Sequence, residues 1–269
     1  MLCAQFLYII KYLDSMRFIG IIPARYASTR FPGKPLAMLC GKTVIERVYC
    51  QAKKMIDDVY VATDDSRIFE TVVSFGGKAV MTSTEHRSGT DRVEEAVTKV
   101  SAETGLTWDV VINIQGDEPF IHPQQIKTVM SCFDDHATQI ATLGKPFGDD
   151  IEAIENPNSP KIAVSISGYA IYFSRSVIPY CKGVEREAWG REFPYLKHIG
   201  LYAYRREVLR QITQIRQSPL EKAESLEQLR WLEHGYRIKV GLTDMETIGI
   251  DTPHDFERAE EFLSRTERR

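Results

Sequence analysis

The chain has 269 residues, of which 43% are hydrophobic and 26% charged, and 34 Lys and Arg against 37 Asp and Glu give a net charge of −3. This composition is typical of a soluble globular protein, and one α/β domain of roughly 250 residues is ordinary at this length. The charge balance gives no electrostatic case for a nucleic acid or a membrane as partner, and it leaves room for a local basic pocket that binds a small anion.

The first residues do not indicate a membrane segment. The apolar run Phe6–Ile10 is too short to span a bilayer, and no basic stretch before it or small-residue cleavage site after it marks a signal peptide. The first convincing element begins near Arg17, directly after Met16. We therefore expect residues 1–15 to be a misassigned start or a loosely ordered extension, and residues 16–269 to form a single domain.

Strands and helices alternate through the first half of the chain. The expected strands are Phe18–Ile22, Val59–Thr63, Ala79–Met81 and Val110–Ile114, and the expected helices are Thr43–Lys54, the segment from its N-cap Asp64 to Phe75, Asp91–Val100 and Pro123–Phe133. This order predicts an α/β fold with a mixed, mainly parallel sheet flanked by helices, in a Rossmann-like three-layer arrangement.

The second half is less regular and contains more β-structure. Two alternating runs on either side of Ser167-Gly168 predict a hairpin, and apolar residues at helical spacing before Gly235 predict a helix. The expected elements are the hairpin strands Ile162–Ile166 and Tyr169–Phe173, the strand Ile199–Tyr204, a helix through Ala223, Leu226, Leu229 and Leu232, the strand Tyr236–Leu242 and the helix His254–Leu263. No Pro/Ser-rich linker separates the two halves, in keeping with one domain.

Several common catalytic motifs are absent. Gly41-Lys42-Thr43 resembles the end of a P-loop, but the earlier glycine that a P-loop needs would fall at Leu36. No G-x-G-x-x-G follows the first strand, and neither H-E-x-x-H nor G-x-S-x-G occurs. The five cysteines are scattered and odd in number, without a C-x-x-C pair. They indicate reduced, cytoplasmic thiols, as opposed to a disulfide framework or a zinc site.

A basic loop follows the first strand. Arg25, Arg30 and Lys34 lie between Ala24 and Pro35, at the carboxyl end of that strand, where open α/β sheets bind ligands. Several cations together can neutralise a triphosphate, and Gly33 lets the backbone approach a ligand closely. Three charges alone are also compatible with a solvated surface loop.

The loop belongs to a longer series of motifs. The string IIPARYASTRFPGKPL, residues 21–36, closely resembles the signature loop of the 3-deoxy-manno-octulosonate (Kdo) cytidylyltransferase family, whose general form neuraminate and hexose enzymes share. Further segments that match this family follow in the family's order: Ser88–Arg92, Asn113–Pro119, Gly168–Arg175, His198–Tyr202, Ser218–Glu221, Leu226–Arg230 and Gly249–Pro253. The resemblance therefore covers about residues 16–260.

The resemblance implies a nucleotide-diphospho-sugar transferase-like fold and a cytoplasmic enzyme. It implies transfer of CMP from CTP to Kdo with release of pyrophosphate, an activation step for lipopolysaccharide biosynthesis. It also implies a homodimer that associates through the irregular second half. CTP and Kdo would be the partners of the site, with no nucleic acid and no membrane.

Two aspartates then become candidate Mg²⁺ ligands. Asp117 follows the strand Val110–Ile114, and Asp251 follows the strand-like run Thr247–Ile250. Mg²⁺ bound to phosphates is usually held by one or two carboxylates, and the family places the metal at both matching positions. Taken singly, either aspartate could be a turn or N-cap residue. Whether one or two metal ions bind is left open.

The resemblance assigns the remaining site residues. The nucleotide-binding set is Ala24, Arg25, Arg30, Lys34, Ser88, Gly89, Arg92 and Gln115; the sugar-binding set is Gln115, Arg175, His198, Tyr202 and Glu227; and the catalytic set is Arg25, Lys34, Asp117 and Asp251. Turn and capping chemistry around Ser88, and ordinary polar positions on a half-buried strand for His198, are the alternatives. No residue stands out as an obligatory general base.

Two other functions compete with this one. The chain could activate a different acidic sugar such as neuraminate, or it could be a non-catalytic nucleotide-sugar-binding protein that keeps the fold. The sequence retains the catalytic candidates Lys34, Asp117 and Asp251, which argues against a protein that has lost catalytic activity.

Overall fold

The computed structural model describes residues 16–27, 30–246 and 249–266. The chain divides into two compact units, unit 1 formed by the residues up to Pro123 together with Thr247–Arg269, and unit 2 formed by Gln124–Glu246. The single domain expected for residues 16–269 stays a prediction. The expected N-terminal extension, residues 1–15, lies outside the described residues.

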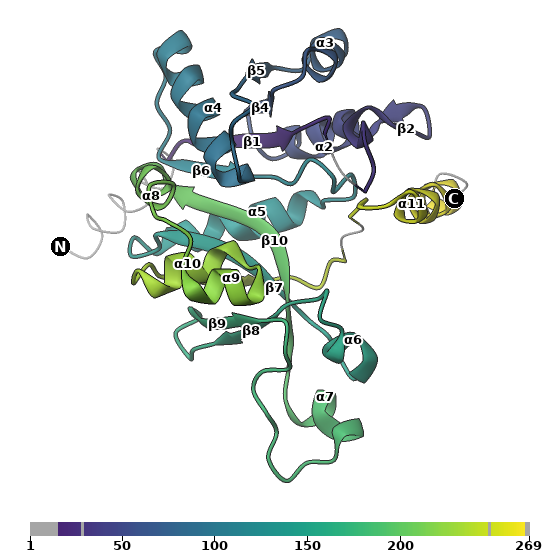
Figure 1. The fold of residues 1–269 in the computed structure, drawn as a ribbon, viewed down its shortest axis with the longest axis vertical. Coiled ribbons are helices and arrows are strands. Elements are labelled where there is room, and N and C mark those ends of the chain that lie inside the picture. The colour runs from purple at the N-terminus through teal and green to yellow at the C-terminus, as the bar shows by residue number, and fades with distance from the viewer. Residues whose placement is uncertain (1–15, 28–29, 247–248, 267–269) are drawn as a thin grey trace, which may run out of the picture. The chain divides into compact units, whose positions relative to one another are not determined.

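Unit 1 is built on parallel strands in the order β6-β1-β4-β5 (Figure 1). Its elements are β1 (Phe18–Ala24), the 3₁₀ turn η1 (Lys34–Leu36), β2 (Met38–Leu39), β3 (Lys42–Thr43), α2 (Val44–Lys53), β4 (Asp58–Thr63), α3 (Ser66–Ser74), β5 (Ala79–Met81), α4 (Gly89–Thr104), β6 (Val110–Asn113) and α11 (Pro253–Thr266). All strands and helices expected in this half are present, to within a few residues at their ends, and β1 runs on through Pro23 to Ala24.

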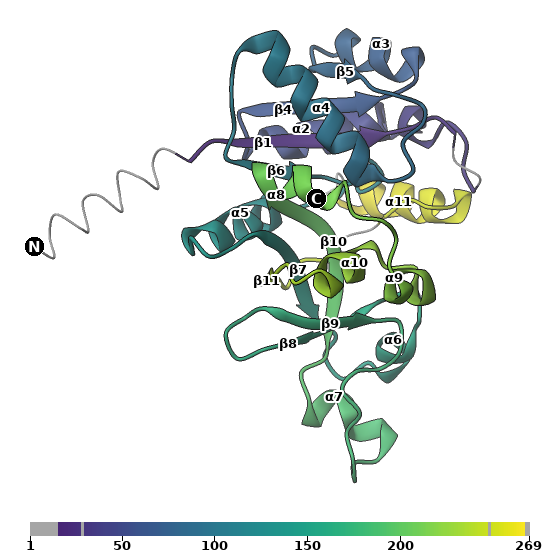
Figure 2. The same cartoon turned by 60° about the vertical axis from the view of Figure 1, so that its left-hand side comes forward.

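The strand order fixes which helices cover which face of unit 1. The chain steps from β1 to β4 to β5 in one direction and then returns to β6 on the other side of β1. Right-handed crossovers therefore place α2 and α3 on one face and α4 on the other, and Figure 2 shows α4 crossing in front of β1. Between these layers Ile19, Ile21 and Ile22 of β1 are fully buried. The reversal between β1 and β6 creates the switch point at which such sheets bind ligands.

One helix of unit 1 begins at a different residue from the one expected. The N-cap of α3 is Asp65, whose Oδ1 accepts a hydrogen bond from the backbone N–H of Arg67 at 2.9 Å. Asp64, expected in that role, accepts instead from the guanidinium of Arg92 at 2.6 Å. Two adjacent aspartates are both competent caps, and the buried arginine decides between them.

The C-terminal helix α11 is attached to unit 1 by an apolar cluster. Leu39, Val44, Ile250 and Ala259 are fully buried at its centre. Aromatic pairs surround them, with ring centroids 5.8 Å apart for Phe31 and Phe256 and 5.0 Å apart for Phe120 and Phe262. Edge-to-face pairs of this kind add to the burial of the rings. The cluster fixes the segment that precedes α11 against the basic loop.

Unit 2 contains a mixed sheet in which β7 pairs in parallel with β11 and antiparallel with β10. Its elements are α5 (Pro123–Ser131, beginning at the last residue of unit 1), η2 (Cys132–Asp134), β7 (Ile140–Pro146), α6 (Ile151–Glu155), β8 (Lys161–Val164), β9 (Ala170–Ser174), η3 (Arg186–Ala188), α7 (Trp189–Glu192), β10 (Leu196–Arg205), α8 (Arg206–Ile212), α9 (Pro219–Glu224), α10 (Glu227–Glu233) and β11 (Ile238–Leu242). The expected α/β class, with a mixed and mainly parallel sheet flanked by helices and an irregular second half, is confirmed.

Two expectations for unit 2 need comment. The hairpin around Ser167-Gly168 is confirmed, since β8 and β9 pair antiparallel there. The one helix expected through Ala223 to Leu232 is wrong, because two helices occupy that range. Ser225 has a left-handed φ of 52°, which ends α9 before α10 begins. β7, α6, α7 and α8 were not predicted.

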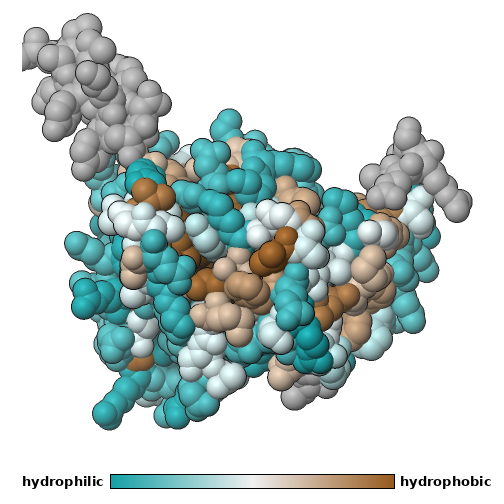
Figure 3. All heavy atoms as spheres, turned by 90° about the horizontal axis from the view of Figure 1, so that it is seen from above, coloured by the Kyte–Doolittle hydropathy of each residue, from teal (hydrophilic) through white to brown (hydrophobic). Residues whose placement is uncertain are grey.

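The surface of unit 1 includes an apolar groove beside its edge strand. Phe69, Val80 and Met81 line it between α3, β5 and α4. Figure 3 shows apolar side chains exposed on this side of the molecule. Within the described ranges, every helix is too short or too polar to cross a membrane.

Candidate active site

The candidate site is a pocket of unit 1 with a volume of about 280 Å³ at the carboxyl ends of β1 and β6. Its lining consists of Pro23, Ala24, Arg25, Arg30, Lys34, Pro35, His86, Arg87, Ser88, Gly89, Arg92, Gln115, Gly116, Asp117 and Asp251. Every residue that the sequence assigned to nucleotide, catalysis or metal is therefore found in one pocket. The volume is close to the lower end of the range for small-molecule sites.

Charges of both signs meet inside this pocket. The side chain of Lys34 is 10% exposed, and its Nζ lies 2.7 Å from Asp117 Oδ2 and 3.4 Å from Asp251 Oδ1. A guanidinium nitrogen of Arg30 lies 3.3 Å from the same oxygen of Asp251. A nearly buried ammonium requires such partners, because an unpaired charge removed from water is very costly. Lys34 thereby brings together two carboxylates that are far apart in the sequence.

The shape of the basic loop depends on Gly33. This residue has a φ of 72°, and a Cβ at its position would lie 3.0 Å from the ring of Tyr26. Its N–H donates to the carbonyl of Tyr26 at 3.0 Å, which closes the loop. The turn η1 follows at once and carries Lys34 into the pocket. Only glycine combines this φ with so little space.

The end of β6 approaches the end of β1 very closely. A Cβ at Gly116 would lie 2.6 Å from the carbonyl oxygen of Pro23, so a side chain there would force the two segments apart. Asp117, the next residue, is linked to the other carboxylate segment, since its carbonyl accepts from the N–H of Ile250 at 2.8 Å. The site therefore depends on close backbone contacts among three separate segments.

The sequence-based reason for placing Asp251 was only partly right. Of the expected strand-like run, Thr247 and Ile248 lie outside the described residues, and Gly249 and Ile250 are not in a strand. Asp251 instead precedes α11, where Asp255 Oδ2 accepts from the N–H groups of Asp251 and Thr252 at 3.2 and 2.9 Å. The capping of a helix, rather than a strand end, positions this carboxylate.

The residues before and within α4 have structural roles as well as pocket positions. Ser88 is the N-cap of α4, its Oγ accepting from the N–H of Asp91 at 3.1 Å. Arg92 is 5% exposed and donates to Thr82 Oγ1 and to Asp64 Oδ2, both at 2.6 Å. The capping alternative considered for this segment is thus realised, and a nucleotide role for Ser88, Gly89 and Arg92 stays a prediction.

Five lining residues were not among those assigned from the sequence: Pro23, Pro35, His86, Arg87 and Gly116. His86 and Arg87 stand directly before Ser88 and line the pocket. Arg87 is an exposed cation for which the described residues provide neither an ion pair nor a hydrogen bond. The basic side chains directly before Ser88-Gly89 were the sequence signal from which His86 and Arg87 could have been predicted as lining residues.

The donor set suits Mg²⁺ only in combination with a ligand. Among the described residues, no group of three or more His, Cys, Asp or Glu side chains is arranged to hold a metal. Asp117 and Asp251 nevertheless converge on one cation, the ammonium of Lys34. Mg²⁺ commonly uses one or two carboxylates and takes its other oxygens from water and phosphate. These two residues fit that pattern.

The four residues assigned to the sugar alone belong to unit 2. The guanidinium of Arg175 donates to the backbone carbonyls of Glu224 at 2.7 Å and Pro157 at 2.9 Å, so it already holds the surrounding loops in place. Glu227 pairs with Arg230 within α10. Their roles in sugar binding stay predictions.

The other two, His198 and Tyr202, lie together on β10. Their ring centroids are 5.3 Å apart, and Thr142 Oγ1 lies 3.1 Å from His198 Nε2. Burial lowers the pKa of His198 well below its ordinary value, so the imidazole is neutral at neutral pH. Burial also raises the pKa of Tyr202, and its buried hydroxyl has no hydrogen-bond partner among the described residues. An unsatisfied buried hydroxyl of this kind is unusual.

Comparison with known proteins identifies the family of the chain. A model of the cytidylyltransferase family matches residues 19–239. A 3-deoxy-manno-octulosonate cytidylyltransferase from Phocaeicola vulgatus is 62% identical over 94% of this chain and 99% of its own length. One from Bacteroides thetaiotaomicron is 62% identical over 92% and 98%.

Solved structures give the same picture. The CMP:2-keto-3-deoxy-manno-octonic acid synthetase in complex with CTP is 40% identical over 93% of this chain and 99% of that one, with a TM-score of 0.84. A putative glucose-1-phosphate thymidylyltransferase from Bacillus anthracis, 15% identical with a TM-score of 0.62 over 91% and 94% of the two chains, shares the fold alone. By the extent and identity of these matches, this chain belongs to the 3-deoxy-manno-octulosonate cytidylyltransferase family of nucleotidyltransferases.

Proposed function

We propose that this protein transfers CMP from CTP to Kdo and releases pyrophosphate. The observation that carries the proposal is the convergence of Arg30 and Lys34 from the basic loop on Asp117 and Asp251 within one pocket. A triphosphate needs several cations, and the carboxylates supply hard oxygen ligands for its metal. The family membership identifies which nucleotide and which sugar to test first.

The chemistry follows from these groups. The 2-hydroxyl oxygen of Kdo forms a bond to the α-phosphorus of CTP, the bond from that phosphorus to the bridging oxygen breaks, and pyrophosphate leaves while the hydroxyl proton passes to solvent. Arg25, Arg30 and Lys34 orient the phosphates and offset the charge that builds on the leaving group. Mg²⁺, held by Asp117 and Asp251, would supply further charge neutralisation and lower the pKa of the attacking hydroxyl.

Lys34 has a double role in this scheme. In the structure its ammonium pairs with both carboxylates, at 2.7 and 3.4 Å. Asp117 and Asp251 would hold the Mg²⁺ that accompanies the nucleotide, and its charge would free Lys34 to contact a phosphate. The same side chain therefore holds the site together before binding and contacts the substrate afterwards.

For the sugar, the proposal relies on His198 and Tyr202 of unit 2. A neutral imidazole and an unpartnered hydroxyl can both hydrogen-bond to sugar hydroxyls, and His198 would orient a hydroxyl without acting as a base. Gln115, which lines the pocket of unit 1, offers both a donor and an acceptor. It would contact the nucleotide or the sugar.

We further propose that the protein is a cytoplasmic homodimer. The four cysteines that the structure describes are free thiols, which suits a reducing compartment. Unit 2 exposes Ile171 on β9 and Tyr180, at 62% and 73% of their surface, and we propose that they belong to the association surface. Sedimentation equilibrium would test the dimer, and Ile171→Glu with Tyr180→Glu should shift the mass toward a monomer.

The experiment for the activity is a pyrophosphate-release assay with a panel of nucleotides and sugars and added Mg²⁺. We expect turnover with CTP and Kdo together, and little with ATP, with neuraminate or without sugar. Lys34→Met should abolish most turnover, whereas Lys42→Met, at an exposed lysine of the adjacent hairpin, should not. Equal rates with ATP, or activity only with neuraminate, would contradict the proposal. Binding of CTP without turnover would favour the non-catalytic alternative.

A further inference from the structure

The segment Thr82–Ser88, between β5 and α4, ends at Ser88, the cap of α4, and its last three residues line the pocket. His86 and Arg87 both belong to it, and neither lies in a helix or strand. A segment without regular backbone hydrogen bonds needs other contacts to stay in place. The contacts that fix this segment therefore determine whether His86 and Arg87 are positioned to bind a nucleotide.

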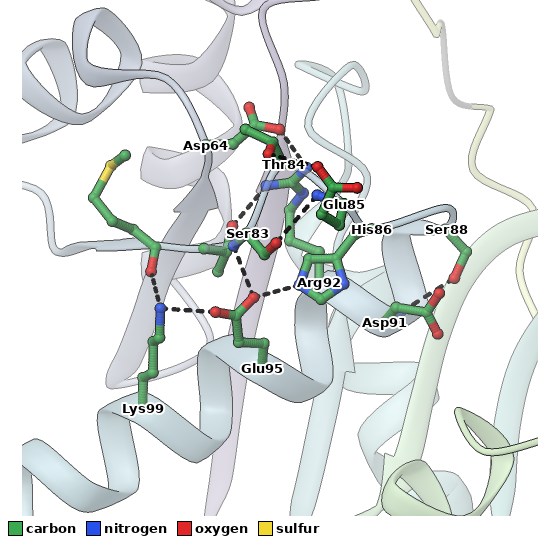
Figure 4. Close-up of polar contacts among 12 residues, drawn as sticks. Asp64, Ser83, Thr84, Glu85, His86, Ser88, Asp91, Arg92, Glu95 and Lys99 are labelled. Atoms are coloured by element: carbon green, nitrogen blue, oxygen red, sulfur yellow. Dashed lines mark hydrogen bonds and ion pairs between the residues drawn. The ribbon is translucent and has the colours of Figure 1, made fainter.

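The middle of this segment is held by one carboxylate on α4. Glu95 Oε2 accepts a hydrogen bond from the backbone N–H of Ser83 at 2.9 Å. The same oxygen accepts from Nε2 of His86, and Figure 4 shows the two side chains pointing toward one another. The segment is thus attached to the helix at its second and its fifth residue, Ser83 and His86, through a single oxygen atom.

The second oxygen of Glu95 is also used. Oε1 lies 2.7 Å from Nζ of Lys99, one turn further along α4, and that ammonium donates to the carbonyl of Met81 at 2.9 Å. Burial acts to raise the pKa of Glu95, but the contacts with Lys99, the Ser83 N–H and His86 outweigh it and lower the pKa to about 2. The carboxylate is therefore ionised at neutral pH, and its hydrogen bonds are charge-assisted.

Glu95 itself does not line the pocket; the loop residues that it holds do. The ends of the loop have their own anchors, since Arg92 binds Thr82 and Ser88 caps α4. We propose that Glu95 is a positioning residue for nucleotide binding: it fixes the segment Ser83–Ser88 so that His86 and Arg87 face the nucleotide. This inference rests on the proposed function of the pocket as the CTP site.

The consequence for kinetics is specific. Without Glu95 the loop samples other conformations, and CTP binds only to the ordered one. The apparent affinity for CTP is then the intrinsic affinity multiplied by the fraction of protein in the ordered conformation. Once CTP is bound, the loop is ordered again and the chemical step is little affected. A positioning role thus predicts a raised KM for CTP, with the KM for Kdo and kcat nearly unchanged.

The test compares Glu95→Ala with two controls on the same helix. Glu94→Ala removes the neighbouring carboxylate, and Lys99→Met removes the ion pair of Glu95 while both loop contacts remain. We expect the KM for CTP to rise about tenfold or more in Glu95→Ala, since two charge-assisted hydrogen bonds are lost, and to stay within about twofold in both controls. Glu95→Gln keeps an acceptor oxygen but no charge and should fall between the wild type and Glu95→Ala.

Two measurements without turnover complete the design. Calorimetric titration with CTP alone should show weaker binding in Glu95→Ala, and hydrogen exchange of residues 83–88 should be faster, with the rest of α4 protected as in the wild type. An unchanged affinity for CTP in both Glu95 variants, or a fall in kcat with KM unchanged, would overturn the inference. A wild-type protein that turns over neither CTP nor Kdo would overturn the proposed function instead, and the exchange measurement would still decide whether Glu95 holds the loop.

Discussion

Replacing Asp117 by Asn removes one charge from the centre of the pocket and leaves the shape of the side chain unchanged. Lys34 then keeps only one ionic partner, Asp251, at 3.4 Å compared with 2.7 Å for Asp117. A hydrogen bond to a charged group contributes about 1.5–3 kcal/mol. Because Asp117 is 33% exposed, we expect the lower end of that range in the free energy of unfolding. In a chain of this size that corresponds to a fall in Tm of about 3–6 °C.

The expected effect of Asp117→Asn on turnover is larger than its effect on folding. Loss of a preorganised electrostatic contact commonly lowers the rate about 10²–10³-fold, which equals roughly 3–4 kcal/mol of transition-state stabilisation. Pyrophosphate release should fall by at least that factor at a temperature where circular dichroism shows a folded protein. Asp57→Asn, at an exposed aspartate elsewhere in unit 1, is the control and should keep its turnover.

The double variant tests whether the two carboxylates serve one metal ion. Asp251→Asn alone should lose activity to a similar extent, and the combined loss should be far smaller than the product of the single losses, because the second substitution removes a ligand of a metal already lost. If either single variant kept near-normal turnover at low Mg²⁺ concentration, the shared-metal mechanism would be wrong. If the losses multiplied, the two carboxylates would have separate functions.

Three further outcomes are expected. Gly116→Ala should lower both Tm and turnover, because its Cβ would lie 2.6 Å from the carbonyl of Pro23, whereas Gly249→Ala, with no atom within 4 Å of the added Cβ, should leave Tm unchanged in a thermal melt. The pKa of Glu95 lies near 2 in the folded protein against an ordinary 4.5, so its contribution to stability is complete above about pH 4.5 and is lost as the pH falls toward 2; urea unfolding between these values should show a smaller pH dependence in Glu95→Gln. A chain beginning at Met16 should keep its activity and Tm, and a large loss of either would show that residues 1–15 contribute to folding.

Local patterns predicted much of unit 1. Apolar runs and turn signals placed β1, β4, β5 and β6 to within two residues but missed the short strands β2 and β3. The rule that ligands bind at the carboxyl ends of strands placed Arg25 and Lys34 in the pocket. Lys34 forms ion pairs with Asp117 and Asp251, which are separated from it by 83 and 217 positions in the sequence. No local sequence pattern can show contacts over such separations. The prediction that both aspartates belong to the site came only from the resemblance to a family. The resemblance did not predict that Asp255 positions Asp251.

Unit 2 was less predictable for physical reasons. β7 is a short apolar run that ends in Gly-Lys-Pro, and such a run cannot be told from a buried helix by its periodicity. Its place in the sheet comes from pairing with β10 and β11. The break between α9 and α10 falls at Ser225, a residue that carries none of the signal that Gly or Pro gives. Both features depend on contacts between distant segments.

The order in which unit 1 is synthesised has a consequence for its pocket. Unit 2 is inserted between Pro123 and Thr247, so α11 and Asp251 come from the last stretch of the chain. At translation rates of about 5–20 residues per second, β1, β4, β5 and β6 emerge on the order of ten seconds before Asp251 does. A nascent or prematurely terminated polypeptide can present the cationic loop and Asp117, but it lacks the second carboxylate and the aromatic contacts of α11. A deletion that removes Asp251 and α11 would therefore leave the pocket incomplete even where the sheet of unit 1 has formed.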